Sequence, residues 1–266
     1  MKKFILFFLI SFIFLFLFLN ISPNNLIDLY VYYSFFSSFN GFRPCITLYS
    51  KEGLIKAFFS GKIVAFYNNY NFGDNFYDRL YYIKIDDETS IILSDVEIYS
   101  NNYLISENET EIKIINNSFD LYLLKNNNFK DPQQYFRFKN FSKPYIAAFY
   151  YIDDYGSLNY FREYYNRNII SIGVKTYTLQ YLDKITKYNS VRKIELYIDE
   201  KKVYDQNFVY NEPNDIINIK KFFYDESTLI ISSIFIPSGK HKLKVVSYDF
   251  NNNSVSKEKN ITIVGE

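Results

Sequence analysis

Short runs of β-branched and aromatic residues recur along this chain of 266 residues. Clusters of Asn, Asp, Gly and Ser separate the runs, and helical periodicity is almost absent beyond residue 22. This pattern is typical of β-strands joined by turns, so it predicts an all-β protein. The clearest expected strands span residues 62–67, 81–85, 91–93, 112–115, 121–124, 191–198, 228–236, 242–248 and 261–264.

Alternation of apolar and polar residues is strongest near the C-terminus. Leu243 and Val245 are expected to face a core while Lys242 and Lys244 face water, because successive side chains of a strand point to opposite faces. The segment 138–144 is the expected domain boundary, since Pro144 cannot continue a central strand. The sequence therefore predicts one domain over residues 23–140 and a second over residues 141–266.

The N-terminal segment carries an export pattern. Lys2 and Lys3 precede an apolar run over residues 4–19 that only Ser11 interrupts. As a helix this run is roughly 24 Å long, short of the ~30 Å hydrocarbon core of a bilayer. No small-x-small cleavage site follows, which favours an uncleaved anchor over a cleaved signal. Residues 1–22 are therefore expected to be a signal peptide or membrane-anchor helix, and the protein is expected to be exported to the periplasm or another extracytoplasmic site.

Composition excludes several classes of function. The net charge is +1 with acids and bases interspersed, so no nucleic-acid partner is expected. The single cysteine, Cys45, forbids an internal disulfide. His241 is the only histidine, which leaves too few soft ligands for a transition-metal site, and it is interpreted as a strand-entry residue. The sequence predicts no cofactor.

The acidic turns and aromatic stretches of the chain are interpreted as structural features and not as binding sites. Residues 86–88 and Asp153-Asp154 do not match a calcium-loop spacing, so solvated turns are favoured over cation sites. The stretches 149–151 and 164–165 could stack sugars, but core and rim positions are favoured in a chain with 28 Tyr and 28 Phe.

Residues in the C-terminal half carry a family resemblance. The segment 191–199 followed by 202–204 resembles a hairpin of bacterial immunoglobulin-like domains. Residues 238–249 and 251–253 resemble the closing segment of the same domains, with a last strand expected at 261–264. The resemblance implies an Ig-like β-sandwich of two antiparallel sheets over residues 141–266.

A second resemblance covers the N-terminal half. Residues 38–48 are similar to the opening segment of lysostaphin-type (LytM-like) zinc endopeptidases. Residues 52–64, 81–86, 90–94 and 119–126, with Asp131-Pro132, follow in the order of that family's later motifs. The resemblance implies an antiparallel-sheet, LytM-like peptidase-type domain over residues 23–140.

The chemistry of that peptidase family is missing from this sequence. The family's metal-site and active-site positions fall on Arg43, Thr47, Ile92, Phe119 and Leu121. A hydrolytic zinc site needs three protein ligands and a group that handles protons, whereas Arg43 is a permanent cation. The resemblance therefore implies a pseudo-enzyme in which these five residues are vestigial positions of the former groove. The alternative of an active peptidase predicts bound zinc.

The expected function follows from these two resemblances and the export segment. We expect a catalytically inactive protein of the cell envelope that binds peptidoglycan or regulates a cell-wall hydrolase. The alternative is a structural or adhesive Ig-like envelope protein in which the peptidase-derived domain has no role.

Overall fold

The computed structural model describes residues 27–265, with gaps at 36, 42, 73–74, 141, 183–184 and 209–219. Strands dominate this part of the chain, which confirms the all-β prediction. The N-terminal helix expected over residues 1–22 lies outside the described residues. Within them, no helix is long and apolar enough to cross a membrane.

The N-terminal half contains a nine-stranded sheet in the order β12-β1-β2-β10-β6-β5-β4-β8, with β11 also paired to β10. A separate three-stranded sheet has the order β3-β9-β7. The strands are β1 (Ile27–Tyr33), β2 (Ile46–Tyr49), β3 (Leu54–Lys56), β4 (Gly61–Phe72), β5 (Asn75–Lys84), β6 (Thr89–Ser94), β7 (Val96–Tyr99), β8 (Leu104–Ile105), β9 (Glu111–Ile114), β10 (Ser118–Lys125), β11 (Asn128–Lys130) and β12 (Phe138–Lys139).

The two sheets of this half enclose a core. Leu48, Leu93 and Leu121 of the large sheet are buried in the same cluster as Ile112 and Ile114 of β9. The opposite face of the large sheet carries a smaller buried cluster of Cys45, Tyr77, Leu80, Ile92 and Tyr122. Strands β2, β6 and β10 are thus covered on both faces, which explains their nearly continuous apolar sequences.

The C-terminal half contains two five-stranded sheets. One has the order β14-β13-β16-β17 with β20 also paired to β16, and the other has the order β15-β22-β21-β18-β19. The strands are β13 (Ser142–Ile152), β14 (Leu158–Tyr160), β15 (Tyr164–Tyr165), β16 (Ile169–Leu182), β17 (Ile185–Asn189), β18 (Lys193–Ile198), β19 (Lys201–Asn207), β20 (Thr228–Phe235), β21 (Gly239–Tyr248) and β22 (Ser254–Ile263).

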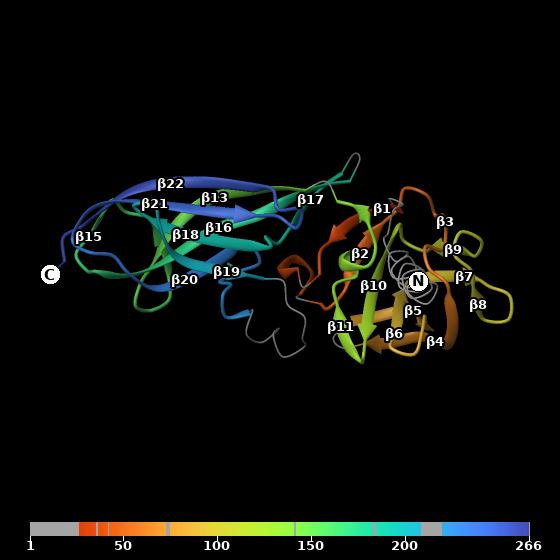
Figure 1. Ribbon diagram of the computed structural model, residues 1–266. Helices are drawn as coiled ribbons and strands as arrows, with labels where there is room; N and C mark the ends of the chain where they lie inside the picture. The colour runs from red at the N-terminus through yellow and green to blue at the C-terminus, as the bar shows by residue number, and fades with distance from the viewer. Residues whose placement is uncertain are drawn as a thin grey trace, which may run out of the picture.

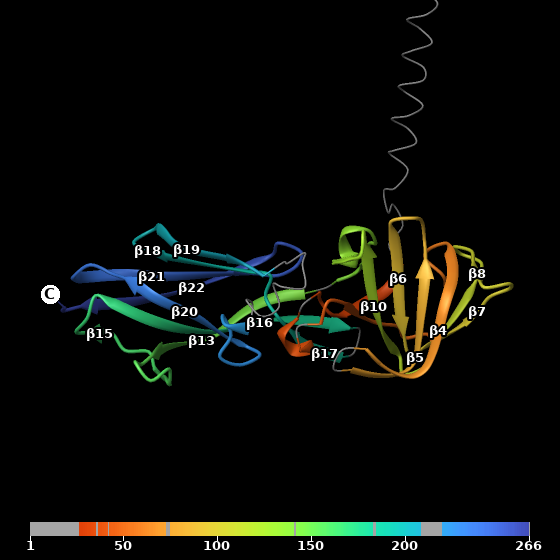
Figure 2. The same ribbon diagram turned by 90° about the horizontal axis from the view of Figure 1, so that it is seen from below.

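Apolar side chains from both five-stranded sheets share one buried cluster, as in two packed layers (Figure 2). Leu243 and Val245 are fully buried, Lys242 is exposed and Lys244 is half-buried, which confirms the predicted alternation along β21. Pro144 lies within β13, where it pairs with Thr178, so the chain does not stop its strand at this proline.

Two hairpins turn on pairs of residues with positive φ. Asn126 and Asn127 join β10 to β11 with φ of 51° and 61°, and Asp199 and Glu200 join β18 to β19 with φ of 46° and 71°. Two consecutive left-handed residues match the twist of the flanking strands and close a tight hairpin. Asn and Asp tolerate this conformation better than most other residues, whereas Glu200 has no such preference.

The two halves lie end to end and meet at β1, β17 and the 3₁₀ turn η1 (Ser38–Asn40) (Figure 1). The Asn189 side-chain amide donates to Ser34 Oγ over 2.9 Å, and both residues are buried. Ser38 Oγ donates to the backbone carbonyl of Glu226 over 2.6 Å, while Phe39 stacks on Tyr188. Buried hydrogen bonds at the junction hold the halves in a defined relation. A second 3₁₀ turn, η2 (Pro132–Gln134), precedes β12.

Candidate functional site

Asp120 is the central residue of a buried polar network in the nine-stranded sheet. It lies in β10, flanked by apolar residues, and its exposed fraction is 4%. The pairing of β10 with β2 places Asp120 directly opposite Thr47. A carboxylate removed from water to this extent must be matched by donors from the protein.

Three side chains supply those donors. The Thr47 hydroxyl donates to Asp120 Oδ1 over 2.6 Å, and the Tyr77 hydroxyl donates to Oδ2 over 2.8 Å. Arg43 forms an ion pair with Oδ2 through Nη1. The Tyr122 hydroxyl lies 2.6 Å from that of Tyr77 and extends the network along β10.

Arg43 is held in place from the other side by η1. Its Nε donates to Asn40 Oδ1 over 3.0 Å, and its Nη2 contacts the same oxygen. The Asn40 amide also donates to Thr47 Oγ1 over 3.1 Å. Gly41, with φ of 62°, ends the 3₁₀ turn in the left-handed region that glycine favours. Asn40 thereby joins the network to the same short turn that contacts the C-terminal half.

The two tyrosine hydroxyls of the network and the neighbouring Cys45 thiol are protonated at neutral pH. Burial raises the pKa of the Tyr77 and Tyr122 hydroxyls, and the charge of Asp120 raises both further. Burial likewise raises the pKa of the Cys45 thiol, so this cysteine is the thiol and not the reactive thiolate. Burial alone lowers the pKa of Arg43, but the negative charge of Asp120 raises it above its ordinary value. These groups are arranged to hold a fixed shape and a fixed ion pair.

The structure brings together some of the positions chosen from the sequence and separates others. Arg43 and Thr47 both contact Asp120, and Ile92 lies in the apolar cluster beside them. Phe119 and Leu121 do not join this group, because their side chains lie in the core on the opposite face of the sheet. Alternation along β10 directs Phe119 and Leu121 to one face and Asp120 to the other.

Sequence reasoning missed Asp120, Tyr77 and Tyr122. One signal was available for Asp120, since an acid inside the apolar run of β10 must find a buried partner. No comparable signal marks the two tyrosines in a chain so rich in this residue.

The network does not fit a zinc ion. Asp120 is its one carboxylate, and its oxygens already accept bonds from Arg43, Thr47 and Tyr77. A guanidinium cannot ligate a metal, and a tetrahedral zinc site uses several Cys, His or carboxylate ligands. Nowhere in the described ranges do three His, Cys, Asp or Glu side chains come together in a way that could hold a metal.

His241 has structural partners in the C-terminal half. Its Nδ1 lies 2.6 Å from Asp199 Oδ2, and its Nε2 lies 2.8 Å from the Pro237 carbonyl oxygen. The ring therefore connects the β18–β19 turn to the loop that precedes β21.

Comparison with known proteins gives no family. No protein-family model and no curated protein matches the chain. Among solved structures, the chain is similar to the fibronectin(III)-like modules of Clostridium thermocellum CbhA, with 9% sequence identity and a TM-score of 0.27 over 83% of this chain and 85% of that chain. A TM-score this low assigns neither a family nor a function.

Proposed function

We propose that the protein is a non-catalytic binding protein of the cell envelope that recognises peptidoglycan or a cell-wall hydrolase. In this proposal the N-terminal half is a degenerate LytM-like domain and the C-terminal half is an Ig-like sandwich. In the same proposal, the export pattern of residues 1–22 directs both halves out of the cytoplasm. The protein would act as a pseudo-enzyme that binds without cutting.

The observation that carries the proposal is the Arg43–Asp120–Thr47 network. Arg43 and Thr47 are two of the positions at which the resemblance expects zinc ligands. Here Arg43 forms an ion pair with Asp120, and the Thr47 hydroxyl donates a hydrogen bond to it. The chain thus keeps an ordered polar cluster at a position where an apolar core would suffice. Buried, satisfied networks of this kind fix a unique arrangement of the surrounding surface.

A pull-down from cell envelopes, combined with a zymogram of the captured proteins, tests the proposal. The full chain is expected to retain a peptidoglycan hydrolase or to co-sediment with purified peptidoglycan. Arg43→Lys should weaken this retention, because lysine cannot reproduce the forked contacts to Asp120 and Asn40.

Arg79→Lys provides the matched control. Arg79 pairs with Glu97 at a partly exposed position, so the same substitution there should leave retention unchanged. Failure to retain either a hydrolase or peptidoglycan contradicts the proposal. Stoichiometric zinc in the purified protein, measured by elemental analysis, would instead favour an active peptidase.

A specific surface favours a second candidate, an adhesive envelope protein. Tyr155 and Tyr160 in the segment between β13 and β15 are 95% and 90% exposed. Tyr164 and Phe235 are also exposed, at β15 and at the end of β20. Large exposed aromatics are typical of contact surfaces. Loss of surface adhesion in a Tyr155→Ser, Tyr160→Ser variant that still retains a hydrolase would favour this candidate.

A further inference from the structure

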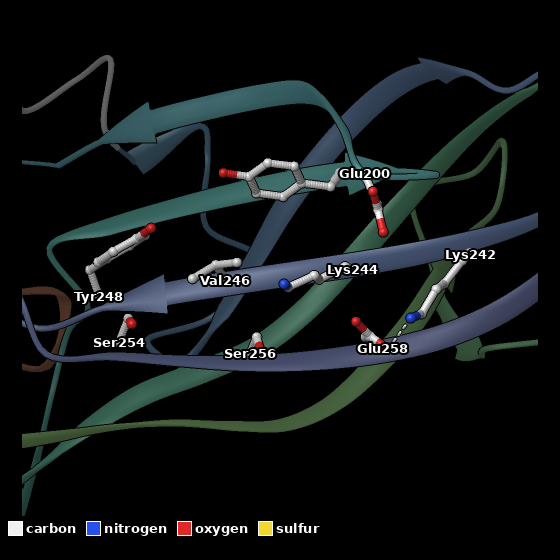
Figure 3. A pocket seen from close by; sticks show the side chains of 9 residues that line it. Glu200, Lys242, Lys244, Val246, Tyr248, Ser254, Ser256 and Glu258 are labelled. Carbon is white, nitrogen blue, oxygen red and sulfur yellow. Dashed lines mark ion pairs between the residues drawn. The ribbon is translucent and has the colours of Figure 1, made fainter.

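A shallow depression lies on the outer face of the second five-stranded sheet. It has a volume of about 550 Å³ and is lined from β18, β21 and β22 (Figure 3). The strand register explains its shape. Val246 pairs with Ser256, and Tyr248 pairs with Ser254, so small side chains leave space beside larger ones.

Two tyrosines beside the depression are fixed by one buried carboxylate. Glu195 is 4% exposed, and its Oε2 accepts a hydrogen bond of 2.8 Å from each of the Tyr197 and Tyr248 hydroxyls. Its Oε1 accepts from Lys193 over 2.7 Å and from Lys202 over 3.1 Å. Both rings are therefore held in place before any ligand arrives, which lowers the entropy cost of binding.

The charges that line the depression cancel. Lys242 pairs with Glu258 over 2.7 Å, while Lys244 and Glu200 also line the space. Figure 3 shows the Lys244 side chain directed along β21 toward Val246. Two bases and two acids give no net attraction for an ion, which favours an uncharged ligand that both donates and accepts hydrogen bonds.

Unused hydrogen-bonding groups surround an apolar floor. Ser254 and Ser256 are exposed and make no side-chain hydrogen bond with any described residue, and Lys244 makes no ion pair with one. Val246, 9% exposed, supplies a small apolar patch between them. Hydroxyls, an ammonium group, tyrosine rings and one apolar patch match a sugar that carries an acetamido group.

We propose that this depression binds a neutral saccharide built from N-acetylhexosamine units. The acetyl methyl packs on Val246, and the ring hydroxyls bond to Lys244, Ser254 and Ser256. The inference rests on the proposed envelope function and names the wall component that the C-terminal half recognises.

Saturation-transfer NMR with the full chain and chitotetraose tests the inference. The strongest transfer is expected at the acetyl methyl groups, with a dissociation constant of about 1 mM or tighter. Cellotetraose, which lacks the acetamido group, should show transfer about tenfold weaker or less. The signal should stay constant between about 0.05 M and about 0.5 M salt, because the ligand is uncharged.

Ser256→Tyr fills the depression from an exposed strand position and should abolish the transfer. Ser232→Tyr makes the same change at an exposed position of β20 and should leave the transfer intact. The inference is overturned by absent transfer, by transfer that survives Ser256→Tyr, or by binding that weakens strongly with salt. This experiment measures binding of a free saccharide, and the pull-down measures retention of a hydrolase. The saccharide inference can therefore fail while the proposed function still holds.

Discussion

Thr47 and Asp120 stand directly opposite each other on β2 and β10, and the Thr47 hydroxyl donates to Asp120 Oδ1 over 2.6 Å. Seventy-three positions separate these two residues along the chain. Their contact places a carboxylate at the centre of the nine-stranded sheet. Arg43 neutralises its charge, and the Tyr77 hydroxyl donates a further hydrogen bond to it.

Replacing Thr47 by valine removes one donor to Asp120 without changing the shape of the side chain. Leaving a buried acceptor one bond short costs about 1–3 kcal/mol. Urea unfolding of Thr47→Val should show a loss of this size. Thr186→Val, at an exposed position of β17, should change the free energy of unfolding by less than about 0.5 kcal/mol. Equal losses in both variants would contradict the assigned hydrogen bond.

Removing only one partner of the Arg43–Asp120 pair should lower the free energy of unfolding more than replacing both partners by apolar residues. Asp120→Leu leaves Arg43 partly buried without its counter-ion, and such changes cost about 3–5 kcal/mol. The double variant Arg43→Met, Asp120→Leu should unfold at a higher urea concentration than Asp120→Leu alone. Additive losses in a double-mutant cycle would show that the two side chains are not coupled.

The free energy of unfolding should decrease as the pH rises from about 4 to about 6, because of Asp131. Burial raises the pKa of its carboxyl to about 6, whereas the unfolded chain releases this proton near pH ~4. Within that window the native state holds more protons than the unfolded state, so a rise in pH favours unfolding.

The variant Asp131→Asn isolates this effect and keeps a side chain that caps η2. Above pH 6 it should be more stable than the parent by up to about 3 kcal/mol. The difference should shrink as the pH falls to about 4. Urea unfolding at several pH values measures it, and a difference that is independent of pH would refute the assignment.

Gly61 is expected to resist substitution. A Cβ atom at this position would meet the carbonyl oxygen of Lys84 at 2.8 Å, because β4 begins close to the end of β5. Gly61→Ala should destabilise the protein by about 1–3 kcal/mol in thermal or urea unfolding. Gly53→Ala meets nothing within 4 Å and serves as the matched control, with little expected change.

Cys45 should be unreactive in the folded protein. It is fully buried, and burial raises the pKa of its thiol. Iodoacetamide at pH 8 should therefore label the chain only after unfolding in urea, as measured by mass spectrometry. Rapid labelling of the folded chain would show that the face of the sheet around Cys45 opens readily.

Several elements of the fold could be predicted from the sequence because their information is local. The run 121–124 lies inside β10, and the run 242–248 lies inside β21 with its alternation as expected. The resemblance to a peptidase opening directed attention to Arg43 and Thr47, which the structure does place together. The same resemblance pointed to Phe119 and Leu121 instead of Asp120, because a shift of one residue along a strand moves each side chain to the opposite face of the sheet.

The sequence by itself determined that this protein is built of strands, because a period of two residues and the turn-forming clusters are visible without any partner. Only the tertiary structure decided which side chains meet Asp120. Period two tells which residues share a face of a strand, but the neighbour across the sheet depends on strand order and register. Here β10 lies between β2 and β6. On one side Asp120 therefore pairs with Thr47 of β2, and on the other side Tyr122 pairs with Ile92 of β6.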